Sequence, residues 1–296
     1  MSSSNGQLMA YIAEDLKENK GVMFPVRAGL LERMFVRKAR TDRLHPNPDD
    51  EFCDPSIGPK EEIITDYANM ILRYKTLRPD GGDDPLMVEK VHPDGYMILN
   101  GHHRWAAAMR VGFEPVPISI VNLTHEADIK TMLRNSSCDR RVTLDLDEVI
   151  FCTDDEVPAE KKLSFPFSRM YKERIRRGSP AVMNFLSKMG YDIWVYTAQY
   201  YSYDYLRAFF RHYSVKLNGI VTGTARKTGN RGGVLKKTEK LLEGRYRETL
   251  HIDTSMVLRT FRGSREMEEY PIEAGPAEWS QAVISTVHDL NTAGSN

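Results

Sequence analysis

The chain has 296 residues, of which 41% are hydrophobic and 28% charged, and its 41 Lys and Arg residues balance 41 Asp and Glu residues. This length favours two domains, and the composition is that of an ordinary globular protein. The zero net charge argues against a dedicated nucleic-acid binder, so no DNA partner is expected. Three cysteines are too few for a disulfide framework or a zinc site. With neither an apolar run of about 20 residues nor a basic and apolar leader, the sequence predicts a cytoplasmic protein without a membrane partner.

The first half of the chain mixes short helices, strands and proline-rich loops. Helices are expected where apolar residues recur at helical spacing, and strands where short apolar runs flank turn residues. The hairpin signal is His92-Pro-Asp-Gly95, which joins two of the strands. The predicted elements are helices over residues 7–18 and 63–74 and strands over 86–91, 96–99 and 116–121.

A glycine turn follows the second hairpin strand and opens an alanine-rich helix, in the sequence Asn100-Gly-His-His-Arg-Trp-Ala-Ala-Ala. The backbone N–H groups and the positive dipole end of such a helix attract anions. Arg104 and the two histidines add charge-assisted donors. The candidate phosphate-binding residues are Gly101, His102, His103 and Arg104.

This stretch, with Asn47-Pro48 and Asp84-Pro85-Leu-x-Val before it, resembles the ParB/sulfiredoxin superfamily over about residues 25–125. The resemblance implies that its Gly-x-x-Arg element holds the phosphates of a nucleotide such as ATP, ADP or CTP. Sulfiredoxins carry a catalytic cysteine directly after the glycine, where this chain has His102. Partition proteins continue into a basic helix-turn-helix domain, which this sequence lacks.

The Gly-His-His-Arg form is most similar to the free-serine kinases of that superfamily. Those kinases have Asp before the glycine, whereas this chain has Asn100, so Asp49, Asp50 and Glu51 stay open as sources of a base. Three interpretations stand side by side. The module is a ParB-like domain without catalysis of its own, or a nucleotide-dependent serine-like kinase or nucleotidase in a bifunctional protein. In the third, the whole chain is a non-enzymatic, nucleotide-regulated, partition-like binding factor.

The second half alternates strands with helices. A polar Asn-Ser-Ser linker over residues 135–140 separates a predicted domain over 1–134 from one over 141–296. Alternation of this kind predicts a doubly wound parallel sheet. The expected strands end at Asp145 and cover 191–197, 219–222 and 249–254, with helices over 180–189, 203–213 and 233–242.

Three of these strands end in polar side chains, namely Asp145, Thr197 and Asp253. Parallel sheets bind ligands beyond the carboxyl ends of their strands, so the three are expected to meet. Asp147 lies two residues after Asp145, and such a pair can share a divalent cation or divide the work of nucleophile and general acid. Taken alone, Asp-x-Asp is equally well explained as a solvated strand end.

The order of Asp-x-Asp, a strand ending in Thr, a Lys-bearing helix and a strand ending in Asp resembles the haloacid dehalogenase (HAD) superfamily of phosphohydrolases over about residues 140–290. Arg177-Gly-Ser-Pro180 and Tyr196-Thr-Ala198 are also similar to the branch with small caps that includes the carboxy-terminal-domain phosphatases. The resemblance implies a Rossmannoid fold and a Mg²⁺-dependent phosphomonoesterase acting on a phosphorylated substrate.

The roles that this resemblance implies fall on the strand ends. Asp145 would form an aspartyl-phosphate, Asp147 would serve as general acid and base, and Thr197 would bind the phosphoryl oxygens. Asp145 and Asp253 would hold Mg²⁺ with the Leu146 carbonyl, and Asp147 would contribute through its backbone or through water.

A lysine would neutralise the charge that develops on the phosphoryl group. Lys236 is preferred, with Lys237 and Lys227 as alternatives, because the first two stand on the expected helix before the last strand. Thr254 stands where many members of the superfamily have a second acid.

Overall fold

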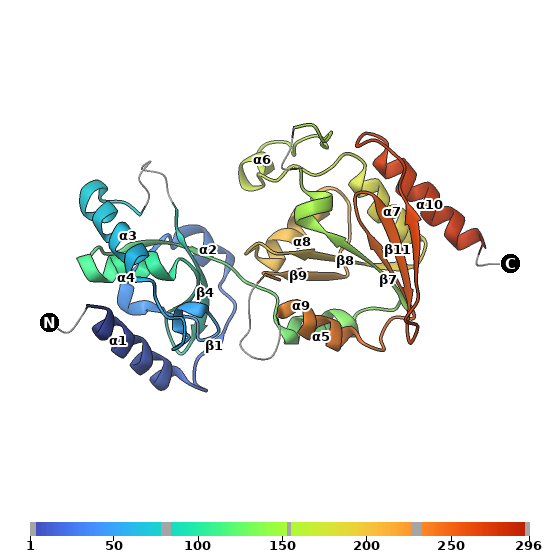
Figure 1. The fold of residues 1–296 in the computed structure, drawn as a ribbon. Coiled ribbons are helices and arrows are strands. Elements are labelled where there is room, and N and C mark those ends of the chain that lie inside the picture. The colour runs from blue at the N-terminus through green and yellow to red at the C-terminus, as the bar shows by residue number, and fades with distance from the viewer. Residues whose placement is uncertain (1–3, 78–83, 153–154, 226–232, 294–296) are drawn as a thin grey trace. The chain divides into compact units, whose positions relative to one another are not determined.

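The computed structural model describes residues 4–77, 84–152, 155–225 and 233–293 (Figure 1). The chain forms two compact units that divide after Asn122. No helix within the described residues combines the length and the apolar character needed to cross a bilayer. Each unit has its own sheet and its own buried core.

The division between the units lies earlier than the linker expected at residues 135–140. Helix α5 (Glu126–Arg134) belongs to the second unit because Ile129 and Met132 are buried in that unit's core. Thr124 also donates from its hydroxyl to the carbonyl of Ile220 in the second sheet, at 2.8 Å. The boundary between the two units therefore follows from the packing of α5 against the second core. The polar composition of residues 135–140 does not mark it.

The first unit is built on a mixed sheet of short strands in the order β2-β6-β4-β5-β3, with β1 paired to β4. Helices α3 and α4 pack against one another, and their apolar faces share a core with the sheet. The predicted helices and the β4–β5 hairpin are confirmed. The elements are α1 (Ser4–Asn19), β1 (Phe24–Pro25), α2 (Leu30–Phe35), β2 (Lys38–Ala39), η1 (Thr41–Arg43), β3 (Leu44–His45), η2 (Glu51–Cys53), α3 (Glu61–Tyr74), β4 (Leu86–His92), β5 (Tyr96–Asn100), α4 (His102–Val111) and β6 (Val116–Ile120).

The second unit has a sheet in the order β12-β11-β10-β7-β8-β9. Strands β10, β7, β8 and β9 are parallel, and β11 and β12 extend the sheet in antiparallel fashion. Figure 1 shows α7 and α10 together on one side of this sheet and α5 and α9 together on the other. The elements after α5 are β7 (Arg140–Asp145), η3 (Leu146–Ile150), α6 (Phe167–Met170), α7 (Ser179–Lys188), β8 (Tyr191–Thr197), α8 (Tyr203–His212), β9 (Gly219–Thr222), α9 (Val234–Leu242), β10 (Glu248–Ile252), β11 (Met256–Phe261), β12 (Met267–Pro271) and α10 (Trp279–Ala293).

The connections of this sheet confirm the predicted parallel arrangement. The chain leaves β7 for β8 and β9 on one side and returns to β10 on the other side of β7. The strand order therefore reverses between β7 and β10, and such a reversal opens a crevice beyond the carboxyl ends of the two strands. The first strand-end carboxylate, Asp145, closes β7 at this crevice.

The strands and the helix that follow Asp253 were not expected from the sequence pattern. Strand β12 is exposed at four of its five residues, so it lacks the apolar alternation that marks a strand with one buried face. Its partner β11 buries only Val257. These two strands form because β11 pairs with the free edge of β10 and β12 pairs with β11. Their formation therefore depends on the rest of the sheet and not on their own residue pattern.

Candidate functional site

The polar strand ends of the second unit lie close to one another in register across three adjacent strands. Ile252 pairs with Leu144 in the β10–β7 ladder, so Asp253 and Asp145 follow at the same height on neighbouring strands. Asp145 in turn pairs with Tyr196, which places Thr197 one residue further along β8. The structure thus gathers Asp145, Thr197 and Asp253 at the crevice where the strand order reverses.

Asp145 is half-buried and held by the backbone that follows it. Its Oδ1 accepts hydrogen bonds from the N–H groups of Asp147 at 2.7 Å and Glu148 at 3.0 Å, within the short π-helical turn η3. Burial raises the pKa of the Asp145 carboxyl; the two N–H groups oppose that shift, and the nearby carboxylates of Asp147 and Asp253 add to it. The three acids are therefore close enough to repel one another.

Asp147 faces β8. Its carboxylate accepts one bifurcated hydrogen bond from the Thr197 hydroxyl, at 2.8 Å to Oδ1 and 3.0 Å to Oδ2, and another from the N–H of Ala198 at 2.7 Å. The Thr197 hydroxyl also accepts from the N–H of Gln199 at 3.1 Å. Thr197 therefore orients Asp147 directly, which adds a positioning contact to the phosphoryl contact expected for it.

Arg176 is a buried cation beside these acids that the sequence analysis did not single out. Its guanidinium lies 4.8 Å from the centre of the Trp279 ring, and the indole N–H of Trp279 donates to the carbonyl of Asp253 at 3.2 Å. Burial lowers the pKa of the Arg176 guanidinium, whereas the neighbouring groups of Cys152 and Asp253 raise it. An arginine stays charged in spite of such burial.

The Arg176 side chain has no hydrogen bond or ion pair to any described residue, and its Nε is fully shielded from solvent. Its backbone is fixed nevertheless, because its N–H donates to the carbonyl of Ile150 at 2.7 Å. A buried charged guanidinium that has no hydrogen-bonding partner among the described residues is costly unless it meets an anion. The only sequence signal for it is its place in the basic run 172–177, which looks like a solvated loop.

Neither of the described lysines that were expected to complete the site has a hydrogen bond or ion pair to the strand-end acids. Lys236 lines a cavity of about 550 Å³ with Arg141, Glu239 and Thr260. The charge of Lys237 is close enough to Glu126 on α5 to help lower the pKa of that carboxyl, after the larger effects of Lys130. Lys227 lies outside the described residues. Helix α9 begins at Val234, so both described lysines lie in its first turn, where their side chains are exposed.

The donor atoms at the strand ends suit a hard cation. Asp145 and Asp253 offer carboxylate oxygens, whereas the Leu146 carbonyl already accepts from the N–H of Phe151 at 2.7 Å and has only its second lone pair to offer. The mutual repulsion of the three acids is the kind that a cation relieves. Within the described part of the chain, no group of three or more His, Cys, Asp or Glu side chains is arranged as a metal cage. This set fits Mg²⁺, which commonly takes one or two carboxylates and keeps several waters.

In the first unit, the turn before α4 depends on glycine. Gly101 has φ +102°, and a Cβ there would lie 2.5 Å from Leu86 Cδ2 and 2.9 Å from Arg104 Nη2. Arg104 is buried and held on Asp84, whose carbonyl and carboxylate both accept from its Nη1, at 2.6 and 2.7 Å. The turn and the arginine therefore form one packed unit at the N-terminus of α4.

Both histidine rings contact the scaffold, and burial disfavours the charged form that was expected of them. His102 is buried against the Phe52 ring, and burial lowers its pKa to about 4, so the ring is neutral at neutral pH. Its Nε2 accepts from the N–H of Asn47 at 3.2 Å. His103 has its pKa lowered by burial as well, and its Nε2 accepts from the N–H of Lys60 at 3.2 Å.

Of the three carboxylates proposed as a base, Asp50 is the one that the structure brings to the glycine turn. Its Oδ1 lies 3.6 Å from His102 Nδ1 and also accepts from the N–H of Phe52 at 2.9 Å, which caps η2. Asp49 uses its own N–H to donate to Asn47 Oδ1, and Glu51 lies within η2. Asp50 is therefore the best placed of the three, although one of its oxygens is engaged in a cap.

Comparison with known proteins supports a ParB-like first unit. The family model of the ParB N-terminal domain matches residues 55–137, which include the glycine turn and α4. A ParB-like protein of Sulfolobus acidocaldarius is 26% identical over 161 residues, which is 48% of this chain and 70% of that protein. An ATP-dependent L-serine kinase of Staphylothermus marinus is 33% identical over 70 residues, which is 23% of this chain and 27% of the kinase.

Two solved structures of C-terminally truncated ParB from Caulobacter crescentus are also similar in sequence. The complex with the centromeric parS site is 29% identical, with a TM-score of 0.23, and the match covers 33% of this chain and 46% of that one. The complex with CTP-γ-S has the same identity and TM-score and covers 35% and 55%. The chain thus spans between about a quarter and 70% of the length of these relatives.

Proposed function

We propose that the second unit is a Mg²⁺-dependent phosphohydrolase that acts through an aspartyl-phosphate on Asp145. The observation that carries the proposal is that Asp145 and Asp253 end neighbouring strands at the same height, where the strand order reverses, with Thr197 one residue further along β8. The resemblance to the HAD superfamily in the order of these residues supports it. Bound Mg²⁺, held by Asp145 and Asp253, would offset the negative charge of the phosphoryl group and of the acids around it.

The chemistry follows from the positions of the two acids. An oxygen of Asp145 attacks the phosphorus, the ester P–O bond breaks, and Asp147 gives its proton to the leaving oxygen. Water then attacks the phosphorus of the aspartyl-phosphate, Asp147 takes back a proton, and inorganic phosphate leaves with Asp145 restored. The hydrogen bonds from Thr197 and Ala198 keep Asp147 oriented for both transfers.

Arg176 takes the place that the sequence analysis gave to a lysine. It is the buried cation whose charge is felt at Asp253, and its guanidinium has donors to offer to phosphoryl oxygens. Phosphoryl transfer depends mostly on placing and neutralising charge. A preorganised cation beside Asp253 would therefore contribute strongly to the rate.

Replacement of Arg176 tests this assignment. Arg176→Gln is expected to lower kcat/KM on a generic aryl phosphate by about 10²-fold, the scale on which one preorganised donor contributes. The assay follows release of the aryl alcohol with Mg²⁺ and with a chelator, and the wild type is expected to need the metal. Arg177→Gln is the matched control, because Arg177 is the exposed neighbour. Wild-type turnover that is absent, or full turnover in Arg176→Gln, would contradict the proposal.

We also infer that the first unit binds a nucleotide at the turn formed by Gly101 and Arg104. The ParB N-terminal match over 55–137 and the similarity to an ATP-dependent L-serine kinase support this inference. So does the position of the buried Arg104 at the N-terminus of α4, directly after the glycine turn. Asp50, next to His102, is the carboxylate through which such a module would act as a base on a small hydroxyl-bearing substrate.

Nucleotide binding is expected to weaken by about tenfold or more in Arg104→Ala, since hydrogen bonds from a charged group contribute roughly 1.5–3 kcal/mol. Labelled ATP, ADP and CTP are titrated against the wild type and the variant, and consumption of ATP is followed with and without serine. Arg110→Ala on the same helix is the control, because Arg110 pairs with Glu61 at 2.8 Å. If the wild type binds none of the three nucleotides, the inference fails.

A further inference from the structure

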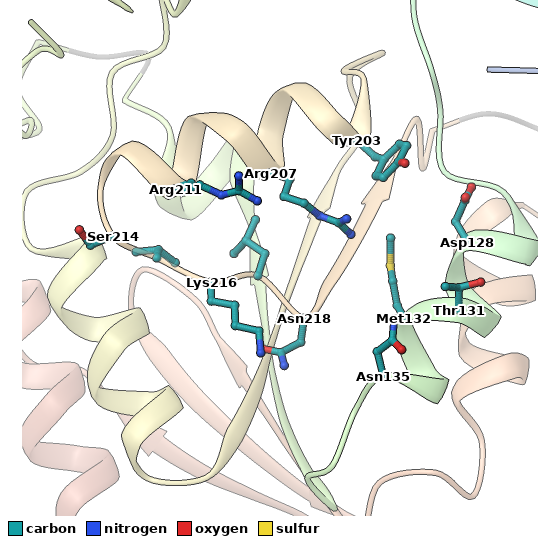
Figure 2. A pocket seen from close by; sticks show the side chains of 12 residues that line it. Asp128, Thr131, Met132, Asn135, Tyr203, Arg207, Arg211, Ser214, Lys216 and Asn218 are labelled. Atoms are coloured by element: carbon teal, nitrogen blue, oxygen red, sulfur yellow. The ribbon is translucent and has the colours of Figure 1, made fainter. Parts of the chain in front are cut away.

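A second cavity lies on the second unit, beside the edge strand β9. Its volume is about 570 Å³, and α5 and α8 form its two walls. Figure 2 shows Arg207 and Arg211 projecting from α8 and Lys216 from the segment that leads into β9, with Met132 facing them from α5. Lys216 precedes β9, whereas the acids of the proposed phosphatase site follow the carboxyl ends of the strands, so the two sites are distinct.

Positive charge dominates this cavity. Arg207, Arg211 and Lys216 are exposed and have no ion pair or side-chain hydrogen bond to any residue that the structure describes. Arg207 lies 5.3 Å from the centre of the Tyr203 ring, a contact that leaves its N–H groups free to donate. The one acid in the lining, Asp128, accepts from the N–H of His125 at 2.8 Å and so caps its own helix.

Arg207 and Arg211 repel one another on α8, and a bound anion would offset this repulsion. Arg207 and Arg211 are four residues apart on α8, where like charges destabilise a helix by a few tenths of a kcal/mol. One helical turn separates them by about 6 Å, which suits contacts to two neighbouring phosphates. Both guanidiniums face the same cavity instead of diverging into solvent (Figure 2).

The size and lining of the cavity favour a small molecule. Val215, Leu217 and Met132 are buried residues of the lining, which also includes polar side chains such as Asn218. A volume of this order, with some apolar lining and a few charged groups, is usual for a small-molecule site. We propose that this cavity binds a diphosphate group, either free or as part of a nucleoside diphosphate.

The test uses the full chain with its methionine methyl groups labelled for NMR, in Mg²⁺-free buffer so that no hydrolysis intervenes. The Met132 methyl signal, assigned with Met132→Leu, is followed as inorganic pyrophosphate and, separately, ADP are added. We expect a saturable shift of this signal in the wild type. Tighter binding of ADP than of pyrophosphate would identify a nucleoside diphosphate, and equal affinity would identify the diphosphate group alone.

Variants decide whether the cations carry the binding. The double change Arg207→Gln and Arg211→Gln is expected to weaken the titration of the Met132 signal at least about tenfold. Lys188→Gln, an exposed lysine at the end of α7, should leave it unchanged. A Met132 signal that responds to neither anion overturns the proposal, and so does a titration that the double variant leaves intact. Neither result bears on aryl phosphate turnover, so this test is independent of the proposed activity.

Discussion

Asp145→Asn is expected to abolish hydrolysis of aryl phosphates by the second unit and to leave its fold intact. An asparagine amide cannot form the aspartyl-phosphate, so kcat should fall by at least about 10³-fold, a conservative figure for loss of a nucleophile. The side-chain oxygen of asparagine can still accept from the N–H groups of Asp147 and Glu148, which hold the turn η3. Removal of one charge also relieves the repulsion among the three acids.

The measurement pairs steady-state turnover with thermal unfolding of the same samples. Asp289→Asn on α10 is the control, since its side chain is 78% exposed and lies on a helix outside the crevice. Turnover that survives in Asp145→Asn at the wild-type rate would rule out the covalent route. If the melting temperature fell strongly together with the activity, Asp145 would instead have a structural role.

Gly219→Ala is expected to destabilise the second unit by about 3 kcal/mol or more, the upper range for overpacking a core. Gly219 pairs directly with Trp194 in the β8–β9 ladder, and a Cβ at this position would lie 1.9 Å from Trp194 Cδ2. Trp194 cannot easily move aside. It is fully buried, and its indole N–H donates to the Tyr246 hydroxyl at 2.9 Å.

Thermal unfolding measures this effect, and a loss of that size should lower the melting temperature by about 10 °C. Gly29→Ala is a matched control because its Cβ would meet nothing within 4 Å and its backbone is extended. A Trp194→Leu change made together with Gly219→Ala should recover part of the loss, since the two residues are in contact and their effects are not additive. Equal stability of Gly219→Ala and the wild type would contradict the packing argument.

Local sequence signals were sufficient for the elements that carry the strand-end acids. The runs before Asp145 and Thr197 are strands as expected: β8 is buried at all seven residues, and β7 buries Arg141, Val142 and Leu144, as suits strands inside a sheet with helices on both faces. The glycine turn at residue 101 was equally readable, since only glycine tolerates that backbone conformation without strain.

Side-chain partners could not be read in the same way. The histidines after Gly101 looked like charged donors, yet burial against Phe52 keeps His102 neutral. Lys236 and Lys237 stand on α9 as expected, yet neither has a hydrogen bond or ion pair to the strand-end acids. Charge and direction depend on what packs around a side chain, and those neighbours come from distant parts of the chain.

The sequence by itself determined the alternation of strands and helices and the acids at the strand ends, because both depend on residues adjacent in the chain. Only the tertiary structure brought Arg176 onto Trp279 beside Asp253, and only it gathered Arg207, Arg211 and Lys216 around one cavity. More than a hundred residues separate Arg176 from Trp279 in the sequence, by the difference of their numbers. No local pattern encodes such a contact, since it arises when the α7 and α10 segments pack together on one side of the sheet (Figure 1).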